Sequence, residues 1–188
     1  MQKTVKYTVF KTGWGYFGLA GGDDGLLRTC LPGKVMEKIK HQLLKGLKSV
    51  NQVSSIKYRE SRIEFDKNFF KMAQDLIAAY FEGACIDFRN IPIILGGFSF
   101  FQRSVLTACR SIGFGRLLTY SGLARKIGRP AAARAVGGAL AGNPLPLIIP
   151  CHRVICANGK IGGFSASGGV TIKKRMLQLE RQSSSQVF

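Results

Sequence analysis

The chain has 188 residues, of which 46% are hydrophobic and 20% are charged. This composition supports a packed core in one large domain or two small ones and excludes an intrinsically disordered chain. No apolar run approaches the roughly 20 residues that cross a bilayer, and the N-terminal stretch lacks the apolar segment of a secretion signal. We therefore expect an intracellular protein with no membrane partner, located in the cytoplasm or, in a eukaryote, in the nucleus.

The net charge is strongly positive, +18 at pH 7, and is unevenly distributed. Residues 1–94 carry 15 Lys and Arg against 9 Asp and Glu, whereas residues 95–188 carry 13 against 1. A basic surface of this kind favours polyanions, with nucleic acid ahead of an anionic membrane surface. The second half is the expected DNA-facing part; a basic surface that serves only solubility is the alternative.

The five cysteines are Cys30, Cys85, Cys109, Cys151 and Cys156. Their odd number and the missing secretion signal argue against a disulfide framework. No Cys-x-x-Cys pair occurs and the chain has only two histidines, which argues against a zinc site. Most of these cysteines are expected to be small, buried hydrophobic side chains.

The pattern of residues 1–90 predicts a small antiparallel sheet with helices. Strands are expected over residues 4–10, 14–20 and 26–31, which are separated by Gly-containing turns. Helices are expected over residues 34–48 and 66–82, the second beginning at the N-cap candidate Asp66. No strong chemical motif occurs here, so we interpret this part as a supporting domain.

Residues 88–97 contain Pro92 and Gly96-Gly97 and predict a connecting loop. We place the domain boundary there, with residues 1–94 as the N-terminal α/β domain and residues 95–188 as the C-terminal domain. Residues 100–112 then predict a helix with an apolar face.

Two short helices joined by a tight turn follow, which is typical of a helix-turn-helix. Thr119 is placed to cap a helix over about residues 120–127, Gly128-Arg129 makes the turn, and Pro130 opens a second helix that ends near Leu140. Apart from Arg134, nearly all side chains of the second helix are very small. Such a helix fits closely into a DNA groove without reading base edges. A small-residue helix packed in a core is the alternative.

Cys151 and His152 are adjacent in the run Leu147-Ile148-Ile149-Pro150-Cys151-His152-Arg153-Val154. A Cys beside a His, after an apolar strand-like run and a Pro, indicates a nucleophile, because the thiolate attacks and a nearby base forms it. Adjacent side chains of an extended chain point to opposite faces, so we expect His152 to act through a water molecule.

In the second half of the chain, one imidazole and one carboxylate are available to assist the Cys151 thiol. His152 is the only histidine after residue 41, and Glu180 is the only acidic residue after residue 87. A nucleophile, a base and an orienting acid form a catalytic relay. A solitary glutamate that is only a helix-end charge explains the count equally well.

Two turn signals follow the cysteine. Asn158-Gly159 lies between apolar runs and predicts a tight hairpin. Residues 162–169 are mostly Gly and Ser and predict a flexible loop that closes over a flat substrate and offers N–H and hydroxyl donors. The alternative is a plain linker into a last helix over residues 170–181.

At Pro150-Cys151-His152-Arg153-Val154 the sequence resembles the O6-alkylguanine-DNA alkyltransferases, also called methylated-DNA–protein-cysteine methyltransferases. Further matches in family order and spacing are Thr119-Tyr120, Ala132 to Ala139, Gly142-Asn143-Pro144 and Gly163-Phe164-Ser165. The resemblance is strong over residues 98–180 and weaker over residues 7–32 and 78–100. It implies an α+β protein, in which a small antiparallel sheet with helices, ribonuclease H-like, precedes a mostly helical, winged-helix-like domain.

The resemblance implies repair of O6-alkylguanine in double-stranded DNA by base flipping and irreversible, single-turnover transfer of the alkyl group to Cys151. It implies a monomer with no metal or organic cofactor, and leaves open activity toward O4-alkylthymine.

The resemblance also implies roles for single residues. His152 resembles the base that deprotonates Cys151 through a water, and Glu180 the acid that orients it. Tyr120 resembles the residue that pushes on the target phosphate and protonates the leaving guanine. Arg134 resembles the finger that fills the gap in the base stack, and Asn143 the hinge between the helix-turn-helix and the active-site strand. Further DNA or base contacts are implied for Ala133, Val154, Phe164 and Ser165.

The sequence departs from the family pattern at two places. Position 164 is Phe where many members carry Tyr, so stacking is kept and a phenol donor is lost. The loop after Ser165 is two residues longer than in several relatives, which changes the spacing from Cys151 to Glu180 and bears on the size of the alkyl group. The zinc ligands of some relatives have no counterpart.

Three other functions would use some of these features. A cysteine hydrolase would use the same Cys-His-Glu set over many turnovers and would need no groove-fitting helix. A DNA-binding regulator would explain the charge and the helix-turn-helix, but it would need base-reading side chains. An alkyltransferase-like damage binder would lack Cys151.

Overall fold

The structure, a computed structural model, describes residues 4–53 and 62–185; residues 1–3 of the N-terminal stretch considered above lie outside these ranges. The chain divides into two compact units. Unit 1 is Met1–Glu82 with Asn90–Phe98, and unit 2 is Gly83–Arg89 with Ser99–Phe188. The proposed division into domains between residues 94 and 95 stays a prediction.

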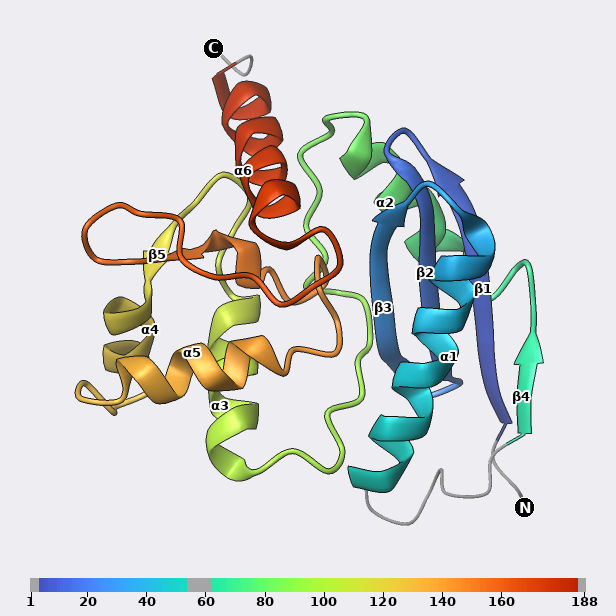
Figure 1. The fold of residues 1–188 in the computed structure, drawn as a ribbon, viewed down its shortest axis with the longest axis horizontal. Helices are drawn as coiled ribbons and strands as arrows, with labels where there is room; N and C mark the ends of the chain where they lie inside the picture. The colour runs from blue at the N-terminus through green and yellow to red at the C-terminus, as the bar shows by residue number, and fades with distance from the viewer. Residues whose placement is uncertain (1–3, 54–61, 186–188) are drawn as a thin grey trace. The chain divides into compact units, whose positions relative to one another are not determined.

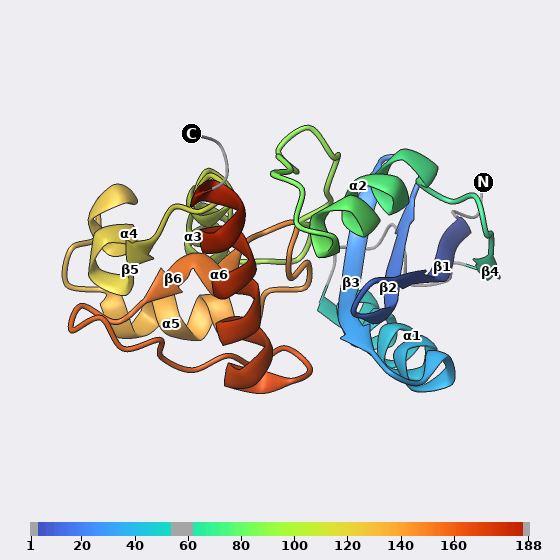
Figure 2. The same ribbon diagram turned by 90° about the horizontal axis from the view of Figure 1, so that it is seen from above.

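Unit 1 is a four-stranded sheet with a helix on each face (Figure 1) (Figure 2). Its elements are β1 (Thr4–Thr12), β2 (Gly15–Gly22), β3 (Gly25–Gly33), α1 (Met36–Val53), β4 (Arg62–Phe65) and α2 (Lys71–Phe81). The strand order is β3-β2-β1-β4, and the first three strands pair antiparallel as expected. β4 was not predicted, and it pairs parallel with β1, so the sheet is mixed.

Apolar residues of the two helices form the core on the two sheet faces. Ile39, Leu43 and Leu47 of α1, spaced by four residues, are buried in one hydrophobic cluster. On the other face, the ring of Phe81 in α2 lies 5.2 Å from that of Trp14 and 6.0 Å from that of Phe17, centroid to centroid.

The predicted start of α2 at Asp66 is wrong. The Asp66 carboxylate accepts a hydrogen bond from the Asn68 amide at 2.9 Å, within a separate turn. Phe70 has a left-handed backbone, with φ of 51°, which no helix continues through. The helix therefore begins only at Lys71.

Unit 2 is mostly helical. Its elements are α3 (Phe100–Arg110), β5 (Leu118–Thr119), α4 (Tyr120–Lys126), α5 (Ala133–Ala141), the 3-10 turn η1 (Cys151–Arg153), β6 (Val154–Ile155) and α6 (Gly169–Ser185). β5 and β6 pair in parallel. Both units together confirm the expected α+β class. None of the helices in the described ranges is long and apolar enough to cross a membrane.

The helix-turn-helix is formed by α4 and α5. The Thr119 hydroxyl caps α4 by accepting a hydrogen bond from the Gly122 amide at 2.9 Å, as predicted. Gly128 takes a positive φ of 69° in the turn, a conformation that glycine adopts at little cost. The second helix begins at Ala133, not at Pro130, because residues 129–132 form a separate turn closed by Ala132 N donating to Arg129 O.

The hairpin predicted at Asn158-Gly159 is only half correct. A tight turn is present: Cys156 N donates to Lys160 O at 2.9 Å, and Gly159 has a φ of 77°. However, β6 ends at Ile155 and pairs with β5, and no strand follows the turn within the described residues up to 185.

Candidate active site

Cys151 begins the single 3-10 turn η1, and the segment before it is not a strand. Ile149 N donates to Leu145 O at 2.8 Å, and Leu147 has a left-handed backbone with φ of 79°. The predicted strand-like run is therefore wrong, because these backbone groups close local turns. Because Cys151 and His152 lie in a 3-10 turn, their side chains are not related by the alternation of an extended chain.

Asn143 holds the cysteine in place. Its Nδ2 donates to Cys151 Sγ at 3.1 Å and to Ile149 O at 2.9 Å, while its Oδ1 accepts from Leu145 N at 3.0 Å. Burial raises the pKa of the Cys151 thiol, and the Asn143 hydrogen bond and the charge of Lys173 offset part of that rise. Cys151 is thus held as a thiol that needs a base.

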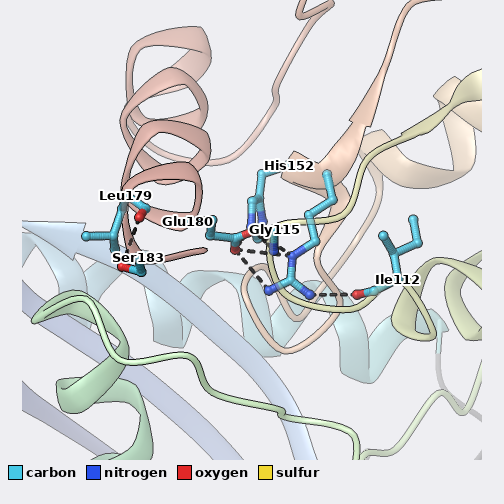
Figure 3. A network of polar contacts seen from close by, with 7 residues as sticks. Ile112, Gly115, His152, Leu179, Glu180 and Ser183 are labelled. Atoms are coloured by element: carbon cyan, nitrogen blue, oxygen red, sulfur yellow. Dashed lines mark hydrogen bonds and ion pairs between the residues drawn. The ribbon is translucent and has the colours of Figure 1, made fainter. Parts of the chain in front are cut away.

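His152 and Glu180 meet in the interior of unit 2 (Figure 3). His152 Nε2 lies 2.8 Å from Glu180 Oε1, and the side chains are 0% and 1% exposed. The two side chains are thus in contact although the longer loop changes the spacing between Cys151 and Glu180. Whether the pair works as a relay stays a prediction.

The Glu180 carboxylate has two further partners. Arg153 donates to it from Nε, at 3.0 Å to Oε2, and from Nη2, at 2.9 Å to Oε1. Gly115 N donates to Oε2 at 3.0 Å, and Arg153 Nη1 donates to Ile112 O at 2.6 Å. Burial raises the pKa of Glu180, but the contacts with His152 and Arg153 outweigh it and lower that pKa to about 2. Glu180 is therefore ionised at neutral pH.

These contacts fix the tautomer of His152. Burial lowers the pKa of the imidazole, and the Glu180 contact offsets this only in part, so the ring is neutral at pH 7. A carboxylate accepts and does not donate, so Nε2 carries the proton and donates it to Glu180. Nδ1 is then a lone-pair acceptor, and it is buried without a hydrogen-bond partner among the described residues. This nitrogen is suited to act as the base.

A cavity of about 470 Å³ opens onto Cys151. It is lined by Tyr120, Gly137, Leu140, Ala141, Cys151, Gly163, Phe164 and Ser165. Its volume is that of a small-molecule site, and its aromatic side chains suit a flat ring. The Ser165 hydroxyl donates to Ala141 O at 2.7 Å across this set of residues, so the loop that carries it is tied to the end of α5.

A second cavity of about 410 Å³ shares Tyr120, Gly137 and Gly163 with the first. The residues it adds are Ser121, Ala133, Arg134, Cys156, Ala157 and Gly162. Arg134 is exposed at the start of α5. Six of the predicted site residues therefore line the two adjoining cavities: Tyr120, Cys151, Phe164, Ser165, Ala133 and Arg134. The other four, which are Asn143, His152, Val154 and Glu180, line neither cavity.

Sequence reasoning missed two charged residues of this region, Arg153 and Lys173. Each is at least nine-tenths buried, and Lys173 Nζ donates to Val154 O at 2.6 Å. Arg153 could have been found, because a buried carboxylate needs a cation and the motif supplies one. Lys173 carries no such signal in the sequence.

The described residues contain no group of His, Cys, Asp and Glu that could hold a metal ion. All five cysteines lie in the described ranges and are free thiols.

Comparison with known proteins gives a consistent result. Residues 100–182 match the family model of the 6-O-methylguanine DNA methyltransferase DNA-binding domain. A methylated-DNA–protein-cysteine methyltransferase of Methanosarcina acetivorans is 36% identical over 174 residues, which cover 93% of this chain and 97% of the relative. The crystal structure of Mycobacterium tuberculosis O6-methylguanine methyltransferase matches with a TM-score of 0.72 at 31% identity, over 96% of this chain and 94% of that one. A crystal structure of Mycobacterium tuberculosis OGT in complex with DNA matches with a TM-score of 0.72 at 30% identity, over 95% and 94% of the two chains.

Proposed function

Because the chain belongs to the methylated-DNA–protein-cysteine methyltransferase family, we propose that its site moves the alkyl group of O6-alkylguanine in DNA onto Sγ of Cys151. The protein repairs alkylated DNA by transferring the alkyl group to a cysteine, which is the activity that the names of its relatives describe. One observation carries the choice of Cys151: it is the thiol that lines the 470 Å³ cavity. It also accepts from Asn143 and adjoins the buried His152–Glu180 pair.

Binding comes first in the proposed sequence. Unit 2 carries almost all of its charge as Lys and Arg, so phosphate contacts dominate the affinity, which should fall with salt. Base chemistry on duplex DNA requires the nucleotide to leave the stack. We propose that Arg134 fills that gap. Ala133 lies beside it at the start of α5, and we propose that its small side chain lets this helix approach the DNA closely.

The chemical step then needs a proton acceptor and a proton donor. The Cys151 proton passes through a water to His152 Nδ1, while Glu180 stabilises the imidazolium that forms. The thiolate attacks the alkyl carbon; the S–C bond forms, the C–O6 bond breaks, and its electron pair goes to guanine.

Guanine takes up one proton, and we assign its donation to Tyr120. The proton that His152 accepted from the thiol then passes through solvent to the Tyr120 phenolate, so that both residues return to their neutral forms and no proton is gained or lost overall. Burial raises the pKa of Tyr120, so its hydroxyl is protonated and able to donate at neutral pH. A thioether is not hydrolysed under mild conditions, so each molecule acts once.

The walls of the cavity position the base. Phe164 offers a ring for stacking, and Ser165 has to release Ala141 O before its hydroxyl can reach guanine. The Val154 carbonyl already accepts from Lys173 but keeps a second lone pair for the base.

We further propose that residues 95–188 carry the binding and the chemistry, with residues 1–94 in support. The protein acts as a monomer in the compartment that holds the DNA, the cytoplasm of a prokaryote or the nucleus of a eukaryote.

Two matched variants test the acceptor. Cys151→Ala and Cys156→Ala each remove one thiol from one of the adjoining cavities. With duplex DNA that carries one O6-methylguanine labelled in the methyl group, Cys151→Ala should bind the duplex but acquire no label, and Cys156→Ala should acquire label as the parent does. Label on Cys151→Ala would contradict the proposal. Tight binding by the parent chain without any transfer would point to a damage binder.

A further inference from the structure

Lys173 of α6 is a buried cation that the mechanism above does not use. It is 0% exposed, and its Nζ donates to Val154 O at 2.6 Å and to Gly163 O at 3.5 Å. The same Nζ lies 5.9 Å from the ring centroids of both Tyr120 and Phe164. The Lys173 ammonium therefore contacts both the backbone of Val154, three residues after Cys151, and residues that line the cavity.

Unit 2 offers Lys173 no free carboxylate. The acidic residues of this unit are Asp87 and Glu180. Asp87 is paired with Arg89 at 2.6 Å on the surface, and Glu180 is bound to His152 and Arg153. A buried ammonium without an anion is costly, and carbonyl oxygens and ring faces offset only part of that cost.

The groups near Lys173 that can become anions are three thiols and a phenol. The Lys173 ammonium lies against Tyr120, Phe164 and Gly163, which line the same cavity as Cys151. At this place its charge lowers the pKa of the Cys151 thiol and offsets part of the effect of burial. Burial raises the pKa of Cys109 well above its ordinary value. Of these groups, Cys151 directly precedes a buried imidazole in the chain, that of His152, whose Nδ1 has no hydrogen-bond partner among the described residues. Cys151 is therefore the anion that Lys173 meets during the reaction.

Of the cations of the site, Lys173 and not His152 is left to balance the negative charge of the Cys151 thiolate. The imidazole is neutral before proton transfer, and the positive charge that it gains is matched by Glu180, 2.8 Å away. The thiolate formed in the same step has no other cation assigned to it, since Arg153 is engaged with Glu180.

We infer that Lys173 is a positioning residue for the transfer, whose ammonium is the counter-ion of the Cys151 thiolate and whose two hydrogen bonds tie Gly163, in the wall of the cavity, to Val154. This inference rests on the proposed role of Cys151. It is a step beyond the relay of His152 and Glu180, because it separates the group that takes the proton from the group that stabilises the sulfur.

Three substitutions separate charge from hydrogen bonding. Lys173→Gln keeps a donor without charge, Lys173→Met removes both, and Lys173→Arg keeps both. The readout is the pH dependence of alkylation of the full chain by iodoacetamide without DNA, measured on the peptide that holds Cys151. The ionisable groups of the surrounding elements, which stay unchanged in all variants, are Cys109 of α3, Tyr120 of α4, His152 and Arg153 of η1, Cys156 after β6 and Glu180 of α6.

The midpoint for Cys151 should rise by about one pH unit or more in the Gln and Met variants, a roughly tenfold loss of rate below the midpoint. The Arg variant should keep the parent midpoint. A purely structural role would leave the Gln midpoint unchanged, and that result would overturn the inference.

A second measurement covers the case in which the neutral variants do not fold. In the unsubstituted chain, the ¹⁵N resonance of Lys173 Nζ should shift with pH at the midpoint of Cys151, and the shift should vanish in Cys151→Ser. A resonance that ignores the Cys151 titration would overturn the inference. A chain that shows the shift but takes no methyl group from DNA would contradict the proposed function and leave the ion pair intact.

Discussion

Replacing Glu180 with Gln tests the buried charge network most sharply. The carboxylate accepts from His152 at 2.8 Å, from Arg153 at 2.9 Å and from Gly115 N at 3.0 Å. Gln preserves the size and removes the charge, so Arg153, which is 4% exposed, becomes a buried cation without an anion. Breaking a buried pair in this way costs about 3–5 kcal/mol. We expect Glu180→Gln to destabilise unit 2 by that amount.

The chain offers a matched control. Asp87 is the other acidic residue of unit 2, and it is paired with Arg89 on the surface, where the side chains are 54% and 58% exposed. Such pairs contribute about 0–1 kcal/mol, so Asp87→Asn should change stability little. Hydrogen exchange in peptides from α6 and residues 150–155 measures the opening of unit 2, and the fluorescence of Trp14, the single tryptophan, follows unit 1. A loss for Glu180→Gln no larger than that for Asp87→Asn would refute the reasoning.

The same carboxylate determines how the stability of unit 2 changes with pH. The pKa of Glu180 falls from 4.5 to about 2 on folding, so its stabilisation is complete above pH 4.5 and is lost as the pH falls toward 2. A shift of this size corresponds to about 3 kcal/mol. The pKa of His152 is also lowered in the folded protein, which adds a loss of stability below pH 6.5. Glu180→Gln should lack the carboxylate part of this acid sensitivity.

Three further predictions concern the cavities. A Cβ at Gly162 would lie 3.2 Å from the Tyr120 ring at a φ of +73°, so Gly162→Ala should cost about 1–3 kcal/mol and slow transfer; Gly163→Ala, with open space around it, should leave urea unfolding unchanged. Asn143→Ala removes the hydrogen bond to the acceptor thiol, worth about 1–3 kcal/mol, and should slow transfer roughly 10- to 100-fold in quenched-flow assays; an unchanged rate would contradict its role. Arg134→Ala should reduce transfer from duplex DNA but not from a free O6-alkylguanine base; equal losses would rule out a role in the stack.

Short-range chemistry explains why parts of the fold were predictable. Thr119 caps α4 and Gly128 turns the chain because a hydroxyl oxygen that accepts from a free helix amide and a positive φ are requirements of a few adjacent residues. The three buried residues of α1 at a spacing of four were visible for the same reason. β4 escaped prediction because its four residues are too few to show alternation, and its pairing with β1 depends on distant contacts.

The residues of the site also divide into those that the sequence predicted and those that it did not. The count of acidic residues indicated Glu180 as the partner of His152, since no other acidic residue follows residue 87, and the two side chains are in contact in the structure. Counting could not distinguish Arg153 and Lys173 from the many basic residues of the second half, because burial is decided by tertiary packing. The 3-10 turn at Cys151 was also hidden, since an apolar run before a Pro is compatible with both a strand and a series of turns.

The most direct test of the central claim is the mass of the intact protein after incubation with an excess of duplex DNA that contains O6-methylguanine. We predict a gain of one methyl group per chain, mapped to the peptide that holds Cys151, with no further reaction however much DNA remains. A methyl group on another cysteine, or repeated removal of methyl groups by an unmodified chain, would contradict the account.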